Sequence, residues 1–315
     1  MRKQKLTIMH TILGAGGAIG TPLAKNLREV HGKPIRLVGR NPIKVNADDE
    51  RVVADLLDAD AVHRAVAGSE VAYLCAGLPY NAKQWARDWP RLMQHVLDAC
   101  IAQGTKLVFV DNVYMYAPEA LPHMTEQSAI GPVSKKGNIR KQVVEMLLAA
   151  VERGKLQALI ARSADFYGPD NRNSILLELV YHNLRNGKRA LWQCDIHKVH
   201  SFTYTPDAAK AIAVLANHEA AYNRVWHLPT AKDQLTGADW IRLFAEQLNT
   251  QPKTWVLKRW LLKLAGIFVP LMRNIEEMSY QYQHDYFFDS SDIEQAFGLK
   301  ATPVKQAIAE IMTAK

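Results

Sequence analysis

The chain has 315 residues, of which 48% are hydrophobic and 22% charged, and its formal net charge is +8. This length and composition suit a globular α/β protein with one large domain, or with one domain and a smaller companion. Its 39 Lys and Arg residues are scattered without a basic block, which argues against nucleic acid as a partner and favours anionic small molecules such as phosphorylated cofactors.

Short apolar runs alternate with amphipathic helical stretches over the first half of the chain, the pattern of βαβ units that build a parallel sheet. Basic residues 1–5 lead into an apolar run that continues into a glycine loop, so residues 6–13 are expected to form a first strand and not a signal peptide. Six further strands are expected at residues 35–38, 52–56, 71–75, 106–110, 156–161 and 224–228. A long helix is expected over residues 140–151, and the region beyond residue 230 is mostly helical in pattern.

The first expected strand is followed by the sequence GAGGAIG at residues 14–20. Gly14, Gly17 and Gly20 stand where a dinucleotide-binding loop needs a sharp turn, close approach of the backbone to a pyrophosphate, and a helix start packed against the sheet. Backbone N–H groups around Ala18 and Ile19 would face the phosphates with the positive end of the helix dipole. The loop therefore predicts a nicotinamide dinucleotide site formed by these five residues.

The end of the second expected strand indicates which dinucleotide is bound. An acidic residue there accepts a hydrogen bond from the ribose when NAD is preferred, whereas this chain reads Val38-Gly39-Arg40. Gly39 leaves room for a 2′-phosphate, and Arg40 can bind it through a forked, charge-assisted contact. We therefore expect NADP, with NAD as the less favoured alternative; the other interpretation of Arg40 is a solvated loop charge.

Five more segments carry a wider similarity: ADL at 54–56, YLCAG at 73–77, VYMYA at 113–117, RSADFYGP at 162–169 and FTYTPDAA at 202–209. With the glycine loop, they resemble the short-chain dehydrogenase/reductase superfamily, in its extended or atypical branch of NAD(P)-dependent epimerases, dehydratases and reductases. The resemblance covers nearly the whole chain. It implies a Rossmann-type doubly wound parallel sheet, here of about seven strands, with a small, mostly helical C-terminal substrate domain. It also implies cofactor contacts by Asp55, Leu56, Ala76 and Gly77.

The resemblance further implies a Ser or Thr after the fifth strand and a Tyr-x-x-x-Lys motif on the next helix, whose Tyr is the acid/base and whose Lys lowers the Tyr pKa. This chain departs from that pattern, because Asn112 stands at the Ser position and none of its eleven Tyr residues is followed by Lys four residues later. Two registers on the helix stay open. Either Lys136 and Arg140, or Gly137 and Lys141, occupy the Tyr and Lys positions, and the acid is absent in both.

Two functions are compatible with this loss. In the first, the chain is an enzyme in which another group donates the proton, with Tyr114 as the first candidate and Asn112 as a hydrogen-bond donor to a carbonyl. Asp165 and His200, which would face the substrate, are the other candidate donors, and Arg140 or Lys141 would bind the nicotinamide ribose. In the second, the fold binds NADP without turnover, as dinucleotide-sensing regulators of the atypical branch do.

Substrate is expected between the carboxyl edge of the sheet and the C-terminal part of the chain. Residues 1–170, with 200–228 returning to the sheet, are predicted to form the NAD(P)-binding domain, and 171–199 and 229–315 the smaller substrate-binding part. The segments predicted to face the substrate, residues 80–89, 165–173, 192–201 and 255–286, are rich in aromatic residues. They favour an apolar or planar small molecule, and a nucleotide-sugar is compatible because Arg172 and Lys188 could bind its phosphates.

The most apolar later run, residues 260–272, contains Lys263 and Pro270, is too short to cross a bilayer, and is expected to pack as a helix in a core. No membrane partner is therefore expected. Cys75, Cys100 and Cys194 lack the spacing of a metal site and leave an odd thiol, which predicts no metal and a reducing compartment, the cytoplasm. A homodimer paired through helices at 89–102 and 140–151 is expected by analogy alone.

Overall fold

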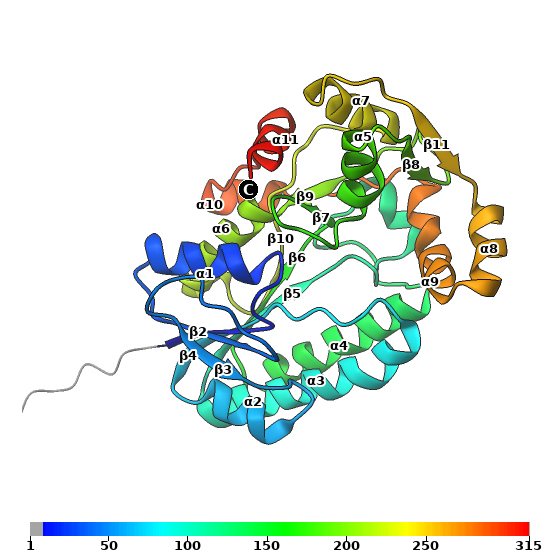
Figure 1. Cartoon of the computed structure of the whole chain (residues 1–315). Helices are drawn as coiled ribbons and strands as arrows, with labels where there is room; N and C mark the ends of the chain where they lie inside the picture. Colours follow the sequence, from blue (N-terminus) through cyan, green and yellow to red (C-terminus); the bar gives the residue numbers. More distant parts are fainter. Residues whose placement is uncertain (1–8, 315) are drawn as a thin grey trace, which may run out of the picture.

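The computed structural model describes residues 9–314, without the side chains of residues 270 and 271. Seven parallel strands form one sheet in the order β10-β6-β5-β4-β1-β2-β3 (Figure 1). Their bounds are Met9–Leu13 (β1), Ile35–Gly39 (β2), Glu50–Val53 (β3), Ser69–Leu74 (β4), Lys106–Asp111 (β5), Ala158–Arg162 (β6) and Val225–His227 (β10). The predicted sheet of about seven strands is confirmed, although residues 6–8 of the first predicted strand lie outside the described residues. β3 ends at Val53, not at residue 56, because its partner β2 ends at Gly39, opposite Val53.

Both faces of this sheet are buried, as expected for parallel strands joined by helical crossovers. Successive residues of one strand pack on opposite faces of the sheet. Tyr73 of β4 and Val108 of β5 pack on one face, and the next residues, Leu74 and Phe109, pack on the other. Helices α1 and α6 cover one face, and α2, α3 and α4 cover the other (Figure 1). These helices span Gly20–Glu29 (α1), Ala59–Val66 (α2), Ala82–Gln103 (α3), Lys135–Glu152 (α4) and Thr205–Ala216 (α6).

Helix α4 begins five residues before the predicted start at residue 140. Ser134 is its N-cap, and the Ser134 hydroxyl accepts a hydrogen bond from the N–H of Gly137 at 2.9 Å. The added first turn carries Lys136 and Gly137, the two residues between which the predicted registers differ.

The strand order reverses between β1 and β4. From β1 the chain moves outward to β2 and β3, and it then crosses back to β4 and continues to β5 and β6 on the other side. At such a switch point the loops leaving the carboxyl ends of the two central strands diverge, and ligands of open α/β sheets bind in the crevice between them.

A second core lies beyond the carboxyl edge of the sheet. Two small parallel pairs contribute to it, β7 with β9 and β8 with β11, together with the irregular turn Leu177–Tyr181, α7 and α11. Its centre holds Trp192, Phe202, Trp240 and Phe244. The bounds are Asp165–Tyr167 (β7), Ala190–Gln193 (β8), Phe202–Tyr204 (β9), Gly237–Gln247 (α7), Thr254–Leu257 (β11) and Val304–Thr313 (α11), with α5 at His182–Arg185.

The last part of the chain serves both cores. Helix α10 (Ser291–Phe297) returns to the main sheet, where Ile293 packs among the residues of α1 and α6, whereas α11 packs on the second core. The predicted assignment of residues 229–315 to the substrate part alone stays a prediction. In this range α10, Tyr286 with Phe288, and Glu277 of α9 all contact the NAD(P)-binding unit.

Helices α8 (Arg259–Phe268) and α9 (Pro270–Met278) form a hairpin at the edge of the molecule (Figure 1). The run at 260–272 is therefore two helices, because Pro270 cannot continue α8 but suits the first position of α9. The expected burial of this run in a core is wrong for the outer side of α8, since Leu262 and Gly266 are its two buried residues and Trp260, Ile267 and Phe268 are exposed. Across residues 9–314, no helix has the length and apolar character needed to cross a membrane.

Candidate functional site

The glycine loop lies at the switch point between β1 and β4. Gly14 and Gly16 both have φ of +89°, a region that glycine adopts freely and other residues avoid. A Cβ on Gly14 would lie 2.5 Å from the Cα of Ala76, so the loops after β1 and β4 touch at this position. Gly16, which sequence reasoning did not single out, has open space around it, and so has Gly77 after β4.

Free donors gather where this loop becomes α1. The N–H groups of residues 16–19 donate to no acceptor among residues 9–314, and Ile19, at the N-cap position, has no side-chain acceptor to offer. The first turn of α1 also contains no acidic residue. Unpaired N–H groups at the positive end of a helix bind phosphate oxygens well, so the residues present fit the pyrophosphate of a dinucleotide.

The predicted adenosine side of the site is continuous with this loop. β2 and β3 end side by side, with the N–H of Ala54 donating to the carbonyl of Gly39 at 3.0 Å. Arg40 is exposed, and its guanidinium has no hydrogen-bond or ion-pair partner within the described part of the chain. Asp55 is exposed with its Oδ1 accepting from the N–H of Leu57, and Leu56 is buried. The structure thus brings Arg40, Asp55 and the glycine loop to one edge, and their cofactor contacts stay predictions.

A buried ionic cluster lies at the end of β5. The carboxylate of Asp111 accepts from Nε of Arg140 at 2.9 Å and from Nε of Arg162 at 3.3 Å, and all three side chains are inaccessible to solvent or nearly so. The Arg140 guanidinium also lies over the rings of Trp89 and Phe109, 4.4 and 4.8 Å from their centroids. The predicted ribose contact by Arg140 does not fit this placement, because the group is already paired in the interior.

The cluster extends to a neutral histidine. Arg162 donates to the Tyr116 hydroxyl at 2.8 Å, which lies 2.7 Å from Nε2 of His227. Nδ1 of His227 lies 2.6 Å from the carbonyl oxygen of Asp289, and since a carbonyl can only accept, Nδ1 carries the proton and Nε2 accepts from Tyr116. Burial and the nearby Arg162 charge lower the pKa of His227 to about 3, so this ring is a neutral structural link.

At position 137, the Tyr position in one of the two predicted registers, α4 has no room for a side chain. A Cβ on Gly137 would collide with the carbonyl oxygen of Tyr114, because the loop after β5 occupies that space. In the other register, the Tyr position is held by Lys136. The fully buried Lys136 donates from Nζ to Glu277 at 2.8 Å and to the carbonyl of Asn274 at 3.0 Å, and lies over the ring of Tyr80.

Lys141 occupies the face of α4 that is still open. Its side chain is half-exposed, and Nζ lies 3.8 Å from Glu145 one turn along the helix. A half-exposed ammonium with one distant partner can still bind ribose hydroxyls, which the paired Arg140 cannot. This placement leaves Lys141 as the candidate for the nicotinamide ribose, and that role stays a prediction.

The two predicted substrate-facing residues lie together. Asp165 Oδ2 is 3.1 Å from Nε2 of His200, and it also accepts from the hydroxyl of Tyr282 at 3.4 Å. The His200 ring is stacked between Tyr282 and Tyr286, each with its ring centroid 4.2 Å away. His200 is buried, so Asp165 is the more accessible member of the pair.

Asp165 is surrounded by tyrosines from distant segments, which we name the tyrosine cluster. Its charge raises the pKa of every member, in addition to the larger effect of burial. The members are Tyr80, Tyr114, Tyr280, Tyr282 and Tyr286. Four of them lie in the segments 80–89 and 255–286, which the sequence predicts to face the substrate, and Tyr114 is the first predicted proton donor, with Asp165 and His200 as the others. Their hydroxyl groups make this a polar region with aromatic walls.

Tyr114 joins the tyrosine cluster to the end of β5. Its ring is stacked on Trp85, and its backbone N–H donates to Oδ1 of Asn112 at 3.0 Å. The Asn112 NH2 group has no acceptor within residues 9–314 and can donate to a ligand carbonyl. Burial and Asp165 raise the pKa of Tyr114, while a hydrogen bond with Tyr80 lowers it.

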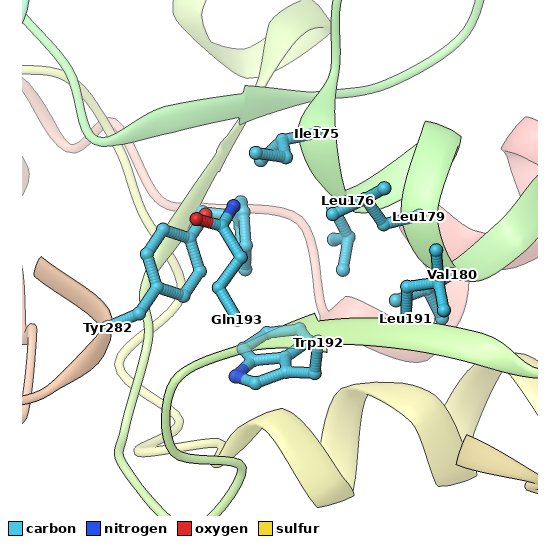
Figure 2. A pocket seen from close by; sticks show the side chains of 9 residues that line it. Ile175, Leu176, Leu179, Val180, Leu191, Trp192, Gln193 and Tyr282 are labelled. Carbon is cyan, nitrogen blue, oxygen red and sulfur yellow. The ribbon is translucent and has the colours of Figure 1, made fainter. Parts of the chain in front are cut away.

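A small apolar cavity of about 10 Å³ adjoins the tyrosine cluster at Tyr282. In Figure 2, Tyr282 and Gln193 lie on one side of it and Leu176, Leu179 and Val180 on the other. The NH2 group of Gln193 is buried without a partner among the described residues. This volume is at the lower limit of what one water molecule needs, so the cavity is far too small for a whole ligand.

Comparisons with known proteins agree with this geometry. A family model described as "NAD dependent epimerase/dehydratase family" matches residues 10–227. No significant match was found among curated protein sequences.

Solved structures with the same fold include nucleotide-sugar enzymes, all of them distant in sequence. UDP-glucose 4-epimerase of Thermotoga maritima with UDP-glucose superimposes with a TM-score of 0.79 at 16% identity, covering 96% of this chain and 97% of that one. The dTDP-glucose 4,6-dehydratase DesIV of Streptomyces venezuelae with NAD gives 0.76 at 17% identity, with 97% of both chains covered. UDP-glucose 4-epimerase of Thermus thermophilus with NAD gives 0.75 at 14%, covering 98% and 100%.

Proposed function

Because the chain belongs to the NAD dependent epimerase/dehydratase family, we propose that it epimerises or reduces a nucleotide-sugar-like or other carbonyl-containing small molecule at the tyrosine cluster. Membership of this family makes the chain an enzyme that binds a nicotinamide dinucleotide. The observation that carries the proposal is that Tyr114, whose N–H is bonded to Asn112, follows the carboxyl end of β5 and lies near enough to Asp165 for that charge to raise its pKa.

The bound nicotinamide would supply hydride transfer. Tyr114 is protonated at neutral pH and carries a hydroxyl that can donate a proton to a substrate oxygen, but burial and Asp165 raise its pKa and make it a weaker acid than a free tyrosine. It is poorly suited to removing a proton, since no Lys lowers its pKa as the family motif would. The NH2 group of Asn112 would orient the carbonyl, and Lys141 would hold the ribose. The residues therefore favour the reductive direction, in which a carbonyl becomes a hydroxyl.

The substrate class is proposed from the polar and aromatic character of the tyrosine cluster. Asp165 can accept hydrogen bonds from sugar hydroxyls, and the tyrosine rings can pack on the faces of a sugar or base. UDP-glucose and dTDP-glucose appear in the names of the structures of similar fold, which makes their class the first to test.

The direct test incubates the full chain with NAD or NADP, or their reduced forms, and a panel of UDP- and dTDP-sugars and 4-keto-sugars. Products are separated by chromatography and identified by NMR, and oxidation of the reduced dinucleotide is followed by absorbance. We expect conversion of at least one member of the panel. Tight dinucleotide binding without any conversion or hydride exchange would contradict the proposal and favour the non-catalytic sensor.

We further propose that Arg40 selects NADP over NAD. Gly39 leaves space beside a guanidinium that is free within the described residues, and no acidic residue follows β2 directly. Replacing Arg40 by Ala is expected to weaken NADPH binding by about 10- to 100-fold, because one charge-assisted contact to a 2′-phosphate is lost, and to leave NADH binding within about twofold. Titration calorimetry of both reduced dinucleotides measures this.

The matched control is Arg51→Ala, which removes another exposed Arg on the neighbouring strand β3. Equal loss for NADH and NADPH in Arg40→Ala, or tighter binding of NADH than NADPH to the unchanged protein, would refute NADP selection. The predicted homodimer and cytoplasmic location stay predictions.

A further inference from the structure

The outer side of the α8–α9 hairpin exposes an apolar stripe. Trp260, Leu264, Ile267 and Phe268 recur at helical spacing along α8, and 63%, 52%, 71% and 80% of each residue is exposed. Leu262 and Gly266 form the opposite, buried stripe, where a Cβ on Gly266 would lie 3.1 Å from the backbone of Arg273 in α9. α8 thus uses one stripe to pack on α9 and leaves the other uncovered.

Trp260 and Phe268 belong to the segment 255–286 that the sequence predicts to face the substrate, but both side chains are exposed at the edge of the molecule. We name the four exposed apolar residues of this stripe the α8 patch: Trp260, Leu264, Ile267 and Phe268. Trp255, on the preceding strand β11, is also 59% exposed. Large apolar residues gathered in one exposed region indicate an interaction surface, whereas single ones do not.

The charge around the α8 patch is mostly positive, although Asp195 lines the same hollow as Lys258, Arg259 and Trp260. Residues 251–275 contain Lys253, Lys258, Arg259, Lys263 and Arg273, all exposed, and no Asp or Glu. The next acids along the chain are already engaged: Glu276 pairs with Arg259 at 2.9 Å, and Glu277 pairs with Lys136.

The neighbouring strand adds to this charge. Strand β8 pairs with β11 so that Ala190 lies opposite Thr254, which brings the exposed Lys188 and Arg189 close to Lys253. The half-buried Asp195, just after β8, is the acid nearest to the patch along that segment.

We propose that the α8 patch docks on an anionic lipid bilayer, with α8 lying in the interface plane. Helices that lie in a membrane interface carry Trp, Phe and Leu on one side and Lys and Arg at the borders of that side, as α8 does. Their apolar side chains enter the headgroup boundary, and their cations contact anionic lipids. A second copy of the chain fits poorly, because symmetric pairing would bring two unbalanced sets of cations face to face. This proposal replaces the expectation, drawn from the length of the apolar run, that no membrane is contacted.

The test is sedimentation of the full chain with vesicles of phosphatidylcholine, with and without phosphatidylglycerol. We expect the chain to pellet with the anionic vesicles, to stay largely in solution with the neutral ones, and to be released by high salt because the charge attraction is screened. The double variant Trp260→Ser, Phe268→Ser is expected to bind the anionic vesicles at least about tenfold more weakly, because its apolar contacts are lost.

The matched control is Ile43→Ser with Val53→Ser, which removes two large apolar side chains that are equally exposed elsewhere on the surface. It should bind as the unchanged chain does, and circular dichroism should show that both double variants are folded. Equal binding to neutral and anionic vesicles, or no loss in the Trp260/Phe268 variant, would overturn the proposal. A second outcome would also overturn it: the unchanged chain binds no vesicles but forms a dimer in light scattering, and the Trp260/Phe268 variant is monomeric.

Discussion

Replacing Asp111 by Asn is expected to lower the free energy of unfolding by about 3–5 kcal/mol, the usual cost of removing one partner from a buried ion pair. Asp111 is the carboxylate on which two buried guanidinium groups converge, those of Arg140 and Arg162. The neutral amide would leave both cations in the core without a counter-charge. Asn is nearly the same size, so cavity formation adds little to the expected loss.

Denaturant unfolding at neutral pH measures this effect. The matched control is Asp233→Asn, the same substitution at an exposed position whose side chain has no ion-pair partner within residues 9–314, and it should change stability by less than about 0.5 kcal/mol. If Asp111→Asn changes the free energy of unfolding as little as this control does, then water or another group, and not Asp111, balances the charges of the two arginines.

Replacing Tyr114 by Phe is expected to lower the turnover number by about 100- to 10,000-fold, the range that a positioned general acid contributes. The ring and its stacking on Trp85 are kept, so the affinity for the dinucleotide should stay within about twofold. Once a substrate is identified, steady-state and single-turnover rates measure this loss. The control Tyr222→Phe removes a buried hydroxyl that donates to Ala216 in the distant α1–α6 core, and it should leave the turnover number unchanged.

The pH profile tests Tyr114 as the proton donor. Burial and Asp165 hold the pKa of Tyr114 well above its ordinary value, so turnover should not decline through loss of the Tyr114 proton up to about pH 10. A decline well below that pH would assign the proton donor to a group with a lower pKa. Full turnover by Tyr114→Phe would assign the proton donor to another group, and the His200–Asp165 pair would be the next to examine.

The strands and the cofactor loop were predictable because the signals that determine them are local. Both faces of β4 and β5 are buried, so these strands appear in the sequence as continuous apolar runs. The glycines at 14–20 are needed for a turn and a close backbone contact that lie within a few residues of each other. The family motifs likewise predict that Asp165 and His200 lie on the substrate side. Their mutual contact was not visible in the sequence, because it depends on β7 pairing with β9.

The tertiary structure decided which charges meet. Lys136 and Glu277 are 141 positions apart, and no periodicity links them; the α8–α9 hairpin folds onto α4 and joins them. Arg140 looked available for a ribose until its contact with Asp111 placed it in the interior. The sequence by itself determined the approximate positions of the strands along the chain, the dinucleotide loop and the missing family tyrosine, since these depend on residue type and spacing. Which groups surround Tyr114, and which face of α8 stays uncovered, depend on how distant segments pack, and packing is a property of the whole fold.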